Sequence, residues 1–208
     1  LMVEAGLCLK PVDGRGLNDR FRDRIMFPIR DRRGNCIAFG GRAMNPKAKA
    51  KYLNSPETLL FDKGNTLYNH KLARQSFGSD TALIVVEGYM DVIAMDSHGF
   101  RATVSTLGTA ITEKQLSLFW QISAEPIVAL DGDTAGTKAA YRLMDLALPF
   151  LEAQKSLRFC LMPEGQDPDD FLKISGKSLM TELVEGSTPL INLLWKRETE
   201  GRVFDSPE

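Results

Sequence analysis

From residue 81 onward, short apolar runs alternate with segments in which apolar side chains recur at helical spacing. The runs are rich in β-branched residues and bounded by turn residues, which is typical of buried strands, whereas the spacing of three and four predicts amphipathic helices. Strands that alternate with helices are joined by crossovers, so they form a parallel sheet with helices on both faces. Strands are expected at 81–87, 102–107, 126–130 and 157–162, and helices at 91–98, 112–122 and 134–151.

The first 80 residues have a different pattern. Two strand-like segments, 24–30 and 36–43, flank the turn D-R-R-G-N, which predicts a β-hairpin. An irregular, lysine-rich stretch and a short helix at 67–75 follow. The predicted fold class is α/β, mixed α+β overall, with a four-stranded, mainly parallel sheet flanked by helices. The predicted boundaries are 1–80 for a small mixed subdomain that is only partly present, 81–175 for the domain with the parallel sheet, and 176–208 for a helical segment with a polar tail.

The net charge of −1 is the sum of a basic N-terminal part and an acidic C-terminal part. Residues 1–80 carry 15 Lys and Arg against 8 Asp and Glu, whereas residues 81–208 carry 11 basic and 19 acidic residues. A basic segment joined to an acidic one indicates that one part contacts phosphates and the other holds metal ions. The alternative, that both sets of charges are solvated surface, stays open at this point.

Composition excludes several classes of protein. A chain of 208 residues that is 43% hydrophobic and 25% charged has enough apolar residues for a core and is not low-complexity or collagen-like. No apolar run approaches the roughly 18 residues of a membrane span, and no signal peptide is visible, so no membrane partner is expected. Cys8, Cys36 and Cys160 show no C-x-x-C spacing. This argues against disulfides and a zinc ribbon and favours a reducing cytoplasm.

Acidic residues gather where the predicted strands end. Because the C-terminal ends of parallel strands share one edge of a sheet, and ligands bind there, these residues are expected to converge on one rim. Gly88 and Gly132 lie among them, where a missing side chain lets backbone or phosphate approach closely. The clusters follow the first, third and fourth strands and consist of Glu87, of Asp131 and Asp133, and of Asp167, Asp169 and Asp170.

Carboxylates that converge in this way need a cation. Two of them about 4 Å apart repel by roughly 4 kcal/mol at an effective dielectric constant near 20. An all-oxygen set of ligands suits Mg²⁺, with Mn²⁺ as a substitute. Each cluster alone has a simpler interpretation: Glu87 as a surface residue, D-G-D as a turn, and Asp167 and Pro168 as the cap and first residue of a helix. Their shared placement favours a site.

Three of these segments resemble the Toprim domain of bacterial DnaG-type DNA primases: V-E-G-Y-M-D at 86–91, L-D-G-D at 130–133 and D-P-D-D at 167–170. Upstream, R-I-M-F-P-I-R-D, F-G-G-R, K-Y-L-N-S-P-E-T and L-F-D-K-G-N-T-L-Y-N are similar to the amino-terminal part of that family's catalytic core. The similarity covers nearly the whole chain in the same order. The Toprim residues are shared with topoisomerases and nucleases, whereas Y-L-N-S-P-E-T and L-F-x-K-G-x-x-L-Y are specific to primases.

The resemblance implies a DNA primase that makes short RNA primers from ribonucleoside triphosphates on a single-stranded DNA template, with an RNA–DNA hybrid as product. It also implies a place in the cytoplasm at the replication fork and a contact with the replicative helicase through a C-terminal module that this sequence lacks. The zinc-binding module of the family is missing as well. The chain is therefore expected to be a fragment of the catalytic core, without zinc.

The resemblance assigns roles to the carboxylates. Glu87 is either a metal ligand or the group that accepts the hydroxyl proton, and the sequence does not decide between these roles. Asp170 is the weakest candidate, because a helix start explains it fully. The metal ligands implied by the family are Glu87, Asp131, Asp133, Asp167 and Asp169, and Glu87, Asp131 and Asp133 are also the implied catalytic residues.

The resemblance further implies that the basic half contacts template phosphates or the nucleoside triphosphate. Lys and Arg supply positive charge without base selectivity, as a polymerase that reads through base pairing requires. Tyr52 and Asn54 offer stacking and hydrogen bonding to a nucleotide. His70 and His98 have no ligand-like neighbours and are expected to be structural. The residues expected to bind nucleotide or template are Arg42, Lys51, Tyr52, Asn54 and Lys63.

Two other classes of function stay open. One is a Toprim phosphodiesterase, either a nuclease or a topoisomerase fragment. A topoisomerase needs a nucleophilic tyrosine in a separate domain, and the four tyrosines here offer no such context. The other is a non-catalytic Toprim module that only binds single strands or partner proteins. The full acidic set argues against it, because a pure binder has no need to maintain that repulsion.

Overall fold

The structure is a computed structural model that describes residues 1–11, 14, 16–108 and 110–201. A five-stranded sheet forms its centre in the order β10-β9-β8-β6-β7, with every neighbouring pair parallel except β10 and β9. The four predicted strands are confirmed, with shorter bounds. The fifth strand, β10, was not predicted, and it adds an antiparallel edge. The strands are β6 (Ile84–Val86), β7 (Thr103–Ser105), β8 (Ile127–Leu130), β9 (Arg158–Leu161) and β10 (Thr188–Pro189).

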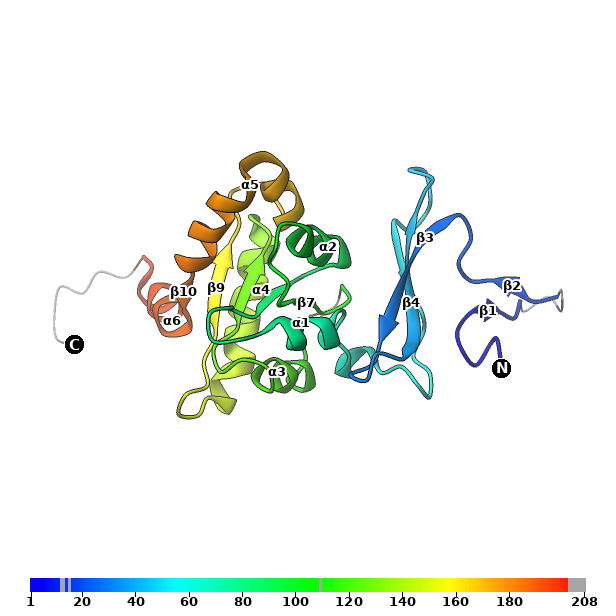
Figure 1. Ribbon diagram of the computed structural model, residues 1–208, viewed down its shortest axis with the longest axis horizontal. Coiled ribbons are helices and arrows are strands. Elements are labelled where there is room, and N and C mark those ends of the chain that lie inside the picture. Colours follow the sequence, from blue (N-terminus) through cyan, green and yellow to red (C-terminus); the bar gives the residue numbers. More distant parts are fainter. Residues whose placement is uncertain (12–13, 15, 109, 202–208) are drawn as a thin grey trace.

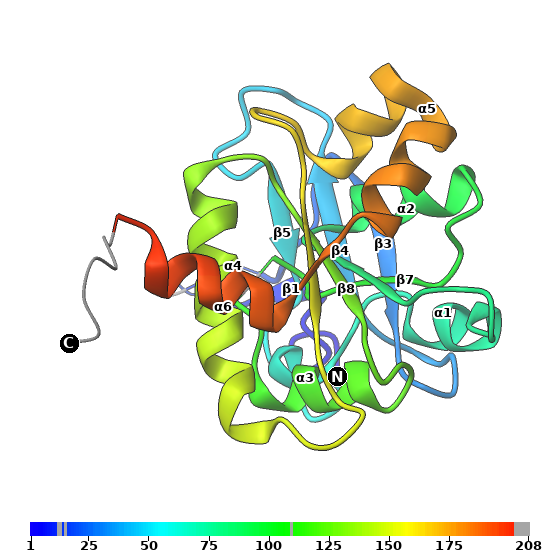
Figure 2. The same cartoon turned by 90° about the vertical axis from the view of Figure 1, so that its left-hand side faces the viewer.

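Helices cover both faces of this sheet (Figure 2). Consecutive strand residues point to opposite faces, so Val85 packs with one set of helices while Ile84 and Val86 pack with the other. One face is covered by α2 (Tyr89–Ser97) and α5 (Pro168–Glu185). The other face is covered by α3 (Glu113–Trp120), α4 (Thr134–Ala147) and α6 (Leu190–Thr199).

The helix ends differ from the predicted ones for local reasons. Helix α4 gives way to a 3₁₀ helix, η2 (Leu148–Phe150), because Pro149 cannot continue an α-helix. Helix α5 already begins at Pro168 and has a non-helical backbone at Gly176, whose φ is 74°. The predicted domain boundary at residue 175 therefore falls at a break within α5. Most of the polar tail expected at the end of the chain lies outside the described residues.

The N-terminal part contains a three-stranded antiparallel sheet in the order β3-β4-β5 (Figure 1). The predicted hairpin is confirmed, and Asp31 stabilises its turn by accepting hydrogen bonds from the backbone of Arg33 and Asn35. The third strand lies in the stretch expected to be irregular. The elements are β1 (Cys8–Leu9), β2 (Asn18–Asp19), β3 (Arg24–Arg30), β4 (Cys36–Ala43), β5 (Tyr52–Asn54), the 3₁₀ helix η1 (Lys63–Asn65) and α1 (His70–Ser76).

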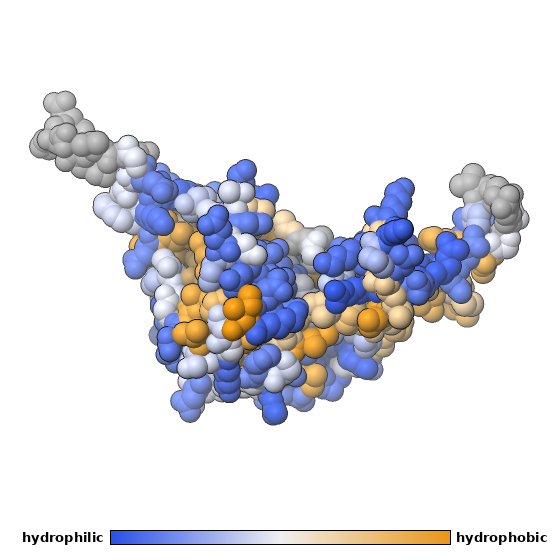
Figure 3. Space-filling view, turned by 90° about the horizontal axis from the view of Figure 1, so that it is seen from above, coloured by the Kyte–Doolittle hydropathy of each residue, from blue (hydrophilic) through white to orange (hydrophobic). Residues whose placement is uncertain are grey.

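A small apolar cluster joins the two sheets. Phe27 and Ile29 of β3 pack with Phe61, with Tyr89 at the start of α2, and with Leu107 after β7. This contact fixes the antiparallel sheet against the body of the molecule. Viewed from the end at which the parallel strands terminate, the surface between the two parts is concave, with hydrophilic residues on both sides (Figure 3). Among the described residues, none of the helices combines the length and the apolar character needed to cross a bilayer.

Candidate active site

The predicted carboxylates lie along one edge of the parallel sheet. Glu87 directly follows β6, Asp131 directly follows β8, and Asp167 lies at the start of α5 after β9. Because β6 pairs with β8 and β8 pairs with β9, the three chain segments are neighbours in space. The shared edge that the sequence predicted is therefore present, and we call these residues, with Asp133 and Asp169, the acidic rim.

Backbone contacts hold two loops of the acidic rim together. The amide of Gly132 donates to the carbonyl of Gln166 at 3.0 Å, and the amide of Gly165 donates to the carbonyl of Gly132 at 2.9 Å. A Cβ atom on Gly132 would lie 1.9 Å from the carbonyl oxygen of Pro163. Only glycine fits this approach, which brings the loop of Asp131 and Asp133 against the loop that leads to Asp167.

Asp131 lies in an environment that disfavours its charge. Burial, followed by the charges of Glu87, Asp167 and Asp133 in that order, raises its pKa to about 6. Among the described residues, no hydrogen-bond donor reaches its buried Oδ1 atom, and the buried Oε1 atom of Gln166 lacks a donor too. Acceptor oxygens that lack donors and repel one another fit a hard divalent cation.

Asp91 joins this cluster, although the sequence analysis did not select it. Its side chain is 7% exposed, and its Oδ2 atom accepts a hydrogen bond of 3.0 Å from the amide of Gly88. Burial raises its pKa to about 7, and the charge of Asp167 is the next largest cause. The signal was available, because Asp91 is the last residue of V-E-G-Y-M-D and lies one helical turn after Glu87.

The start of α5 forms the predicted helix cap and also gathers carboxylates. Asp167 is the N-cap, since its Oδ1 atom accepts a hydrogen bond of 2.7 Å from the amide of Asp170, and Pro168 is the first helical residue. Carboxylate oxygens of Asp167, Asp169 and Asp170 also lie within 4.8 Å of one another. Lys173 contacts Asp169 at 2.6 Å. The cap residue Asp167 is thus also a member of a cluster of three carboxylates.

Two of the predicted basic residues border one cavity. Arg42 on β4 and Lys51 before β5 line a space of about 520 Å³ together with Ile25 and Met44. Arg42 is half-buried and approaches the sulfur atom of Met90, the residue after Tyr89, at 3.9 Å. The structure therefore places the two cations on the antiparallel sheet, on the side that adjoins the start of α2.

Tyr52 and Asn54 lie between the two sheets. Asn54 donates a hydrogen bond of 3.0 Å to the carbonyl of Leu107 and accepts one from the Tyr89 hydroxyl. Tyr52 is 40% exposed and meets the Tyr89 ring edge-on. Burial raises the pKa of Tyr52, while Arg42 lowers it and Asp91 raises it. Its phenol is thus within electrostatic reach of both the basic and the acidic residues.

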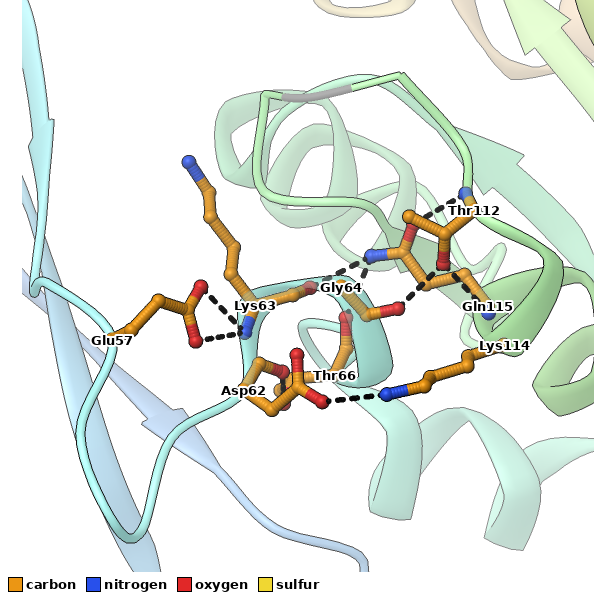
Figure 4. A network of polar contacts seen from close by, with 8 residues as sticks. All are labelled: Glu57, Asp62, Lys63, Gly64, Thr66, Thr112, Lys114 and Gln115. Atoms are coloured by element: carbon orange, nitrogen blue, oxygen red, sulfur yellow. Dashed lines mark hydrogen bonds and ion pairs between the residues drawn. The ribbon is translucent and has the colours of Figure 1, made fainter.

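Lys63 belongs to a separate, well-ordered loop (Figure 4). Its amide donates to the carboxylate of Glu57 at 3.1 and 3.2 Å, and its carbonyl accepts from Gln115 of α3 at 3.0 Å. Thr112, the predicted cap of α3, donates to the carbonyl of Gly64. The backbone of Lys63 is therefore fixed, and its side chain points away from the network (Figure 4).

A parallel sheet with Glu, Asp-x-Asp and Asp-x-Asp after three adjacent strands defines a Toprim-like domain. Residues 84–172 match the family model described as Toprim-like, and residues 1–74 match the model of the N-terminal domain of the DNA primase catalytic core. The chain belongs to the DnaG-type DNA primase family, as the resemblance predicted.

The relatives support this assignment along the whole chain. The DNA primase of Pasteurella multocida is 43% identical over 207 residues, which are 100% of this chain and 35% of that protein. The crystal structure of a DNA primase domain from Pseudomonas aeruginosa is 41% identical with a TM-score of 0.92, over 99% of this chain and 64% of that one. A DnaG primase catalytic domain bound to single-stranded DNA is 39% identical with a TM-score of 0.90, over 99% and 66%. The chain thus spans about a third of the Pasteurella primase.

Proposed function

We propose that this chain is the part of a DNA primase that carries the nucleotidyl transfer, making short RNA primers on single-stranded DNA. The observation that carries the proposal is the acidic rim, which adjoins a basic antiparallel sheet across Tyr52. The similarity to a DnaG catalytic domain bound to single-stranded DNA supports the same template here. In this proposal the chain acts in the cytoplasm, and the longer protein contacts the replicative helicase through other segments.

The reaction joins a ribose 3′-hydroxyl to the α-phosphorus of a nucleoside triphosphate and releases pyrophosphate. Mg²⁺, or Mn²⁺ in its place, neutralises charge on the phosphate oxygens and lowers the pKa of the attacking hydroxyl when it is bound. Asp131, Asp133, Asp167 and Asp169 would hold it, and Glu87 is a further ligand or accepts the hydroxyl proton. The two orphaned acceptor atoms, on Asp131 and on Gln166, support a cation at this rim.

The basic residues have a different part in the proposal. Arg42 and Lys51 border one cavity and offer positive charge to the triphosphate or to the template backbone. Lys63 offers positive charge to the same phosphates from a loop whose backbone is fixed by hydrogen bonds. Tyr52 presents an exposed ring beside Lys51, whose ammonium group lies 5.7 Å from the ring centroid. These groups contact phosphate and sugar, so the base sequence of the primer is set by pairing with the template.

The test compares the chain with Asp131→Asn in one reaction that contains labelled single-stranded DNA, ribonucleotides and Mg²⁺. We expect RNA from the parent chain and none from the variant, which keeps its fold because the exchange removes charge without changing shape. Asp96→Asn is the matched control, since Asp96 is an exposed carboxylate on α2. Degraded template would identify a nuclease instead. No product from the parent chain, with magnesium-dependent stabilisation retained, would identify a binding module.

A further inference from the structure

His70 is buried in a way that leaves its ring unsatisfied. The residue is 4% exposed, and neither ring nitrogen has a hydrogen-bond partner among the described residues. Burial, followed by the charges of Arg32 and Arg74, lowers its pKa to about 4, so the ring is neutral at pH 7. A neutral imidazole carries one N–H donor and one acceptor nitrogen. Leaving both unpaired in the interior costs stability, which makes this residue an exception that needs an explanation.

The ring borders a cavity of about 210 Å³ whose lining contains both apolar and charged side chains. Leu67 and Leu118 form part of the apolar wall, and Arg30 and Arg32 of the β3–β4 hairpin also line the cavity. In the described part of the chain, both guanidinium groups lie outside any ion pair, and their hydrogen bonds go to a backbone carbonyl and to an amide side chain.

The two carboxylates that line the same cavity already have partners. Asp31 accepts hydrogen bonds from the backbone of Arg33 and Asn35, and Asp62 pairs with Lys114 at 3.2 Å. With Asp62 paired to Lys114, the two arginines outnumber the one remaining carboxylate, Asp31, so the lining of the cavity keeps a net positive charge. A ligand that matches this surface carries negative charge and oxygen acceptors.

The cavity has a rigid wall and is separate from the acidic rim. One wall is the loop of η1, which Gln115 and Thr112 hold against α3 (Figure 4). None of the rim carboxylates lines this cavity. Helix α3 lies toward the bottom of the view in Figure 1, and α5 lies at the top. A ligand here would not occupy the place of the reacting nucleotide.

We propose that this cavity binds a small phosphate-bearing ligand, with the phosphate against Arg30 and Arg32 and with His70 as the buried hydrogen-bond partner. A phosphate group offers acceptor oxygens to a ring N–H and, in its monoprotonated form, an O–H to an unprotonated ring nitrogen, so it can pair with whichever nitrogen faces the cavity. The shared chemistry is the phosphate, which either free phosphate or a mononucleotide supplies. In a mononucleotide the base would lie along the apolar wall. The inference does not depend on the proposed function.

The experiment follows the imidazole resonances of His70 by NMR while inorganic phosphate, or adenosine monophosphate, is added at millimolar concentration. EDTA is present so that divalent cations do not recruit phosphate to the acidic rim. We expect a saturable shift of the His70 resonances. Tighter binding of adenosine monophosphate than of phosphate would identify a nucleotide site, and equal binding would identify a site for the phosphate group alone. A His70 signal that does not respond to either compound would mean that the cavity holds only water, and it would overturn the proposal.

Variants test whether phosphate binds in this cavity or is attracted only by positive charge at the surface. The affinity of each variant is measured by calorimetry. His70→Leu removes both hydrogen-bonding atoms and should weaken binding about tenfold, whereas His70→Gln, which keeps a donor and an acceptor, should retain part of the affinity. Arg32→Gln should also weaken binding. Arg33→Gln, one residue along in the same turn but outside the cavity, should leave it unchanged. Equal loss from Arg32→Gln and Arg33→Gln would refute the site. Thermal unfolding without ligand reports whether each variant is folded.

Discussion

Asp91→Asn should make the metal-free protein more stable at pH 8. Burial and the neighbouring carboxylates raise the pKa of Asp91 from 3.8 to about 7. Below pH 3.8 the side chain is neutral in both the folded and the unfolded state and has no effect on the free energy of unfolding. As the pH rises from 3.8 to 7, the unfolded state loses its proton while the folded state keeps it, so the free energy of unfolding falls progressively, and above pH 7 the folded state bears the full cost of the buried charge.

The size of the effect follows from the same two values. An interval of about 3 pH units, at about 1.4 kcal/mol per unit, corresponds to about 4 kcal/mol. Asparagine has the same shape, and its Oδ1 atom still accepts the hydrogen bond from the amide of Gly88. Its NH₂ group needs a new partner, which costs about 1–2 kcal/mol in a buried place. A net gain of about 2–3 kcal/mol is therefore expected at pH 8.

The assay is urea unfolding, followed by circular dichroism, of the parent chain, Asp91→Asn and the control Asp96→Asn. In EDTA, Asp91→Asn should exceed the parent at pH 8 and fall about 1–2 kcal/mol below it near pH 4, where only the cost of the buried NH₂ group remains, while Asp96→Asn should match the parent at both. Mg²⁺ should stabilise the parent more than Asp91→Asn and so narrow the difference at pH 8. Equal stability of Asp91→Asn and the parent at pH 8 in EDTA would refute the electrostatic reasoning.

Two further predictions concern the acidic rim and the basic loop. Gly132→Ala should destabilise the protein by about 4 kcal/mol or more, because the new Cβ would lie 1.9 Å from a backbone oxygen. Urea unfolding measures the change. In the control Gly64→Ala, the new Cβ would meet nothing closer than 3.5 Å, so the urea midpoint should change little. Lys63→Ala should raise the nucleotide or template concentration needed for primer synthesis and leave the Mg²⁺ affinity, measured by calorimetry, nearly unchanged. An equal loss of Mg²⁺ affinity and of nucleotide or template affinity would make Lys63 a structural residue.

The parallel sheet and its acidic rim were predictable because their signals are local. Buried parallel strands appear in the sequence as continuous apolar runs, and Ile127–Leu130 is buried at each of its four positions. Once the strands are parallel, the residues that follow them must share an edge, so Glu87, Asp131 and Asp167 converge without any knowledge of side-chain positions. The cap at Asp167 was predictable for the same reason, since it depends on residues within one turn.

The parts that were not predicted depend on partners distant in the sequence. Strand β10 has two residues, Thr188 and Pro189, and exists because they pair with β9; strand β5 pairs with β4 in the same way. Strands of two or three residues contain too few positions to show an alternation of apolar and polar side chains. The high pKa of Asp91 likewise arises from burial and from carboxylates on other loops, which spacing along the chain does not reveal.

Tyr89 lies in the short segment between Glu87 and Asp91 and also packs against the antiparallel sheet. Its ring stacks on Phe27 with centroids 5.0 Å apart, and a Cβ on Gly40 would lie 2.8 Å from its ring and hydroxyl. The antiparallel sheet therefore rests on a residue that is two positions from Glu87 and two positions from Asp91. Because Tyr89 is also the first residue of α2, any displacement of the basic sheet acts on the helix start that contains Asp91 and directly follows Glu87 and Gly88. The Tyr89 ring, together with the other residues of the apolar cluster, thus helps to set the distance between the basic residues and the acidic rim.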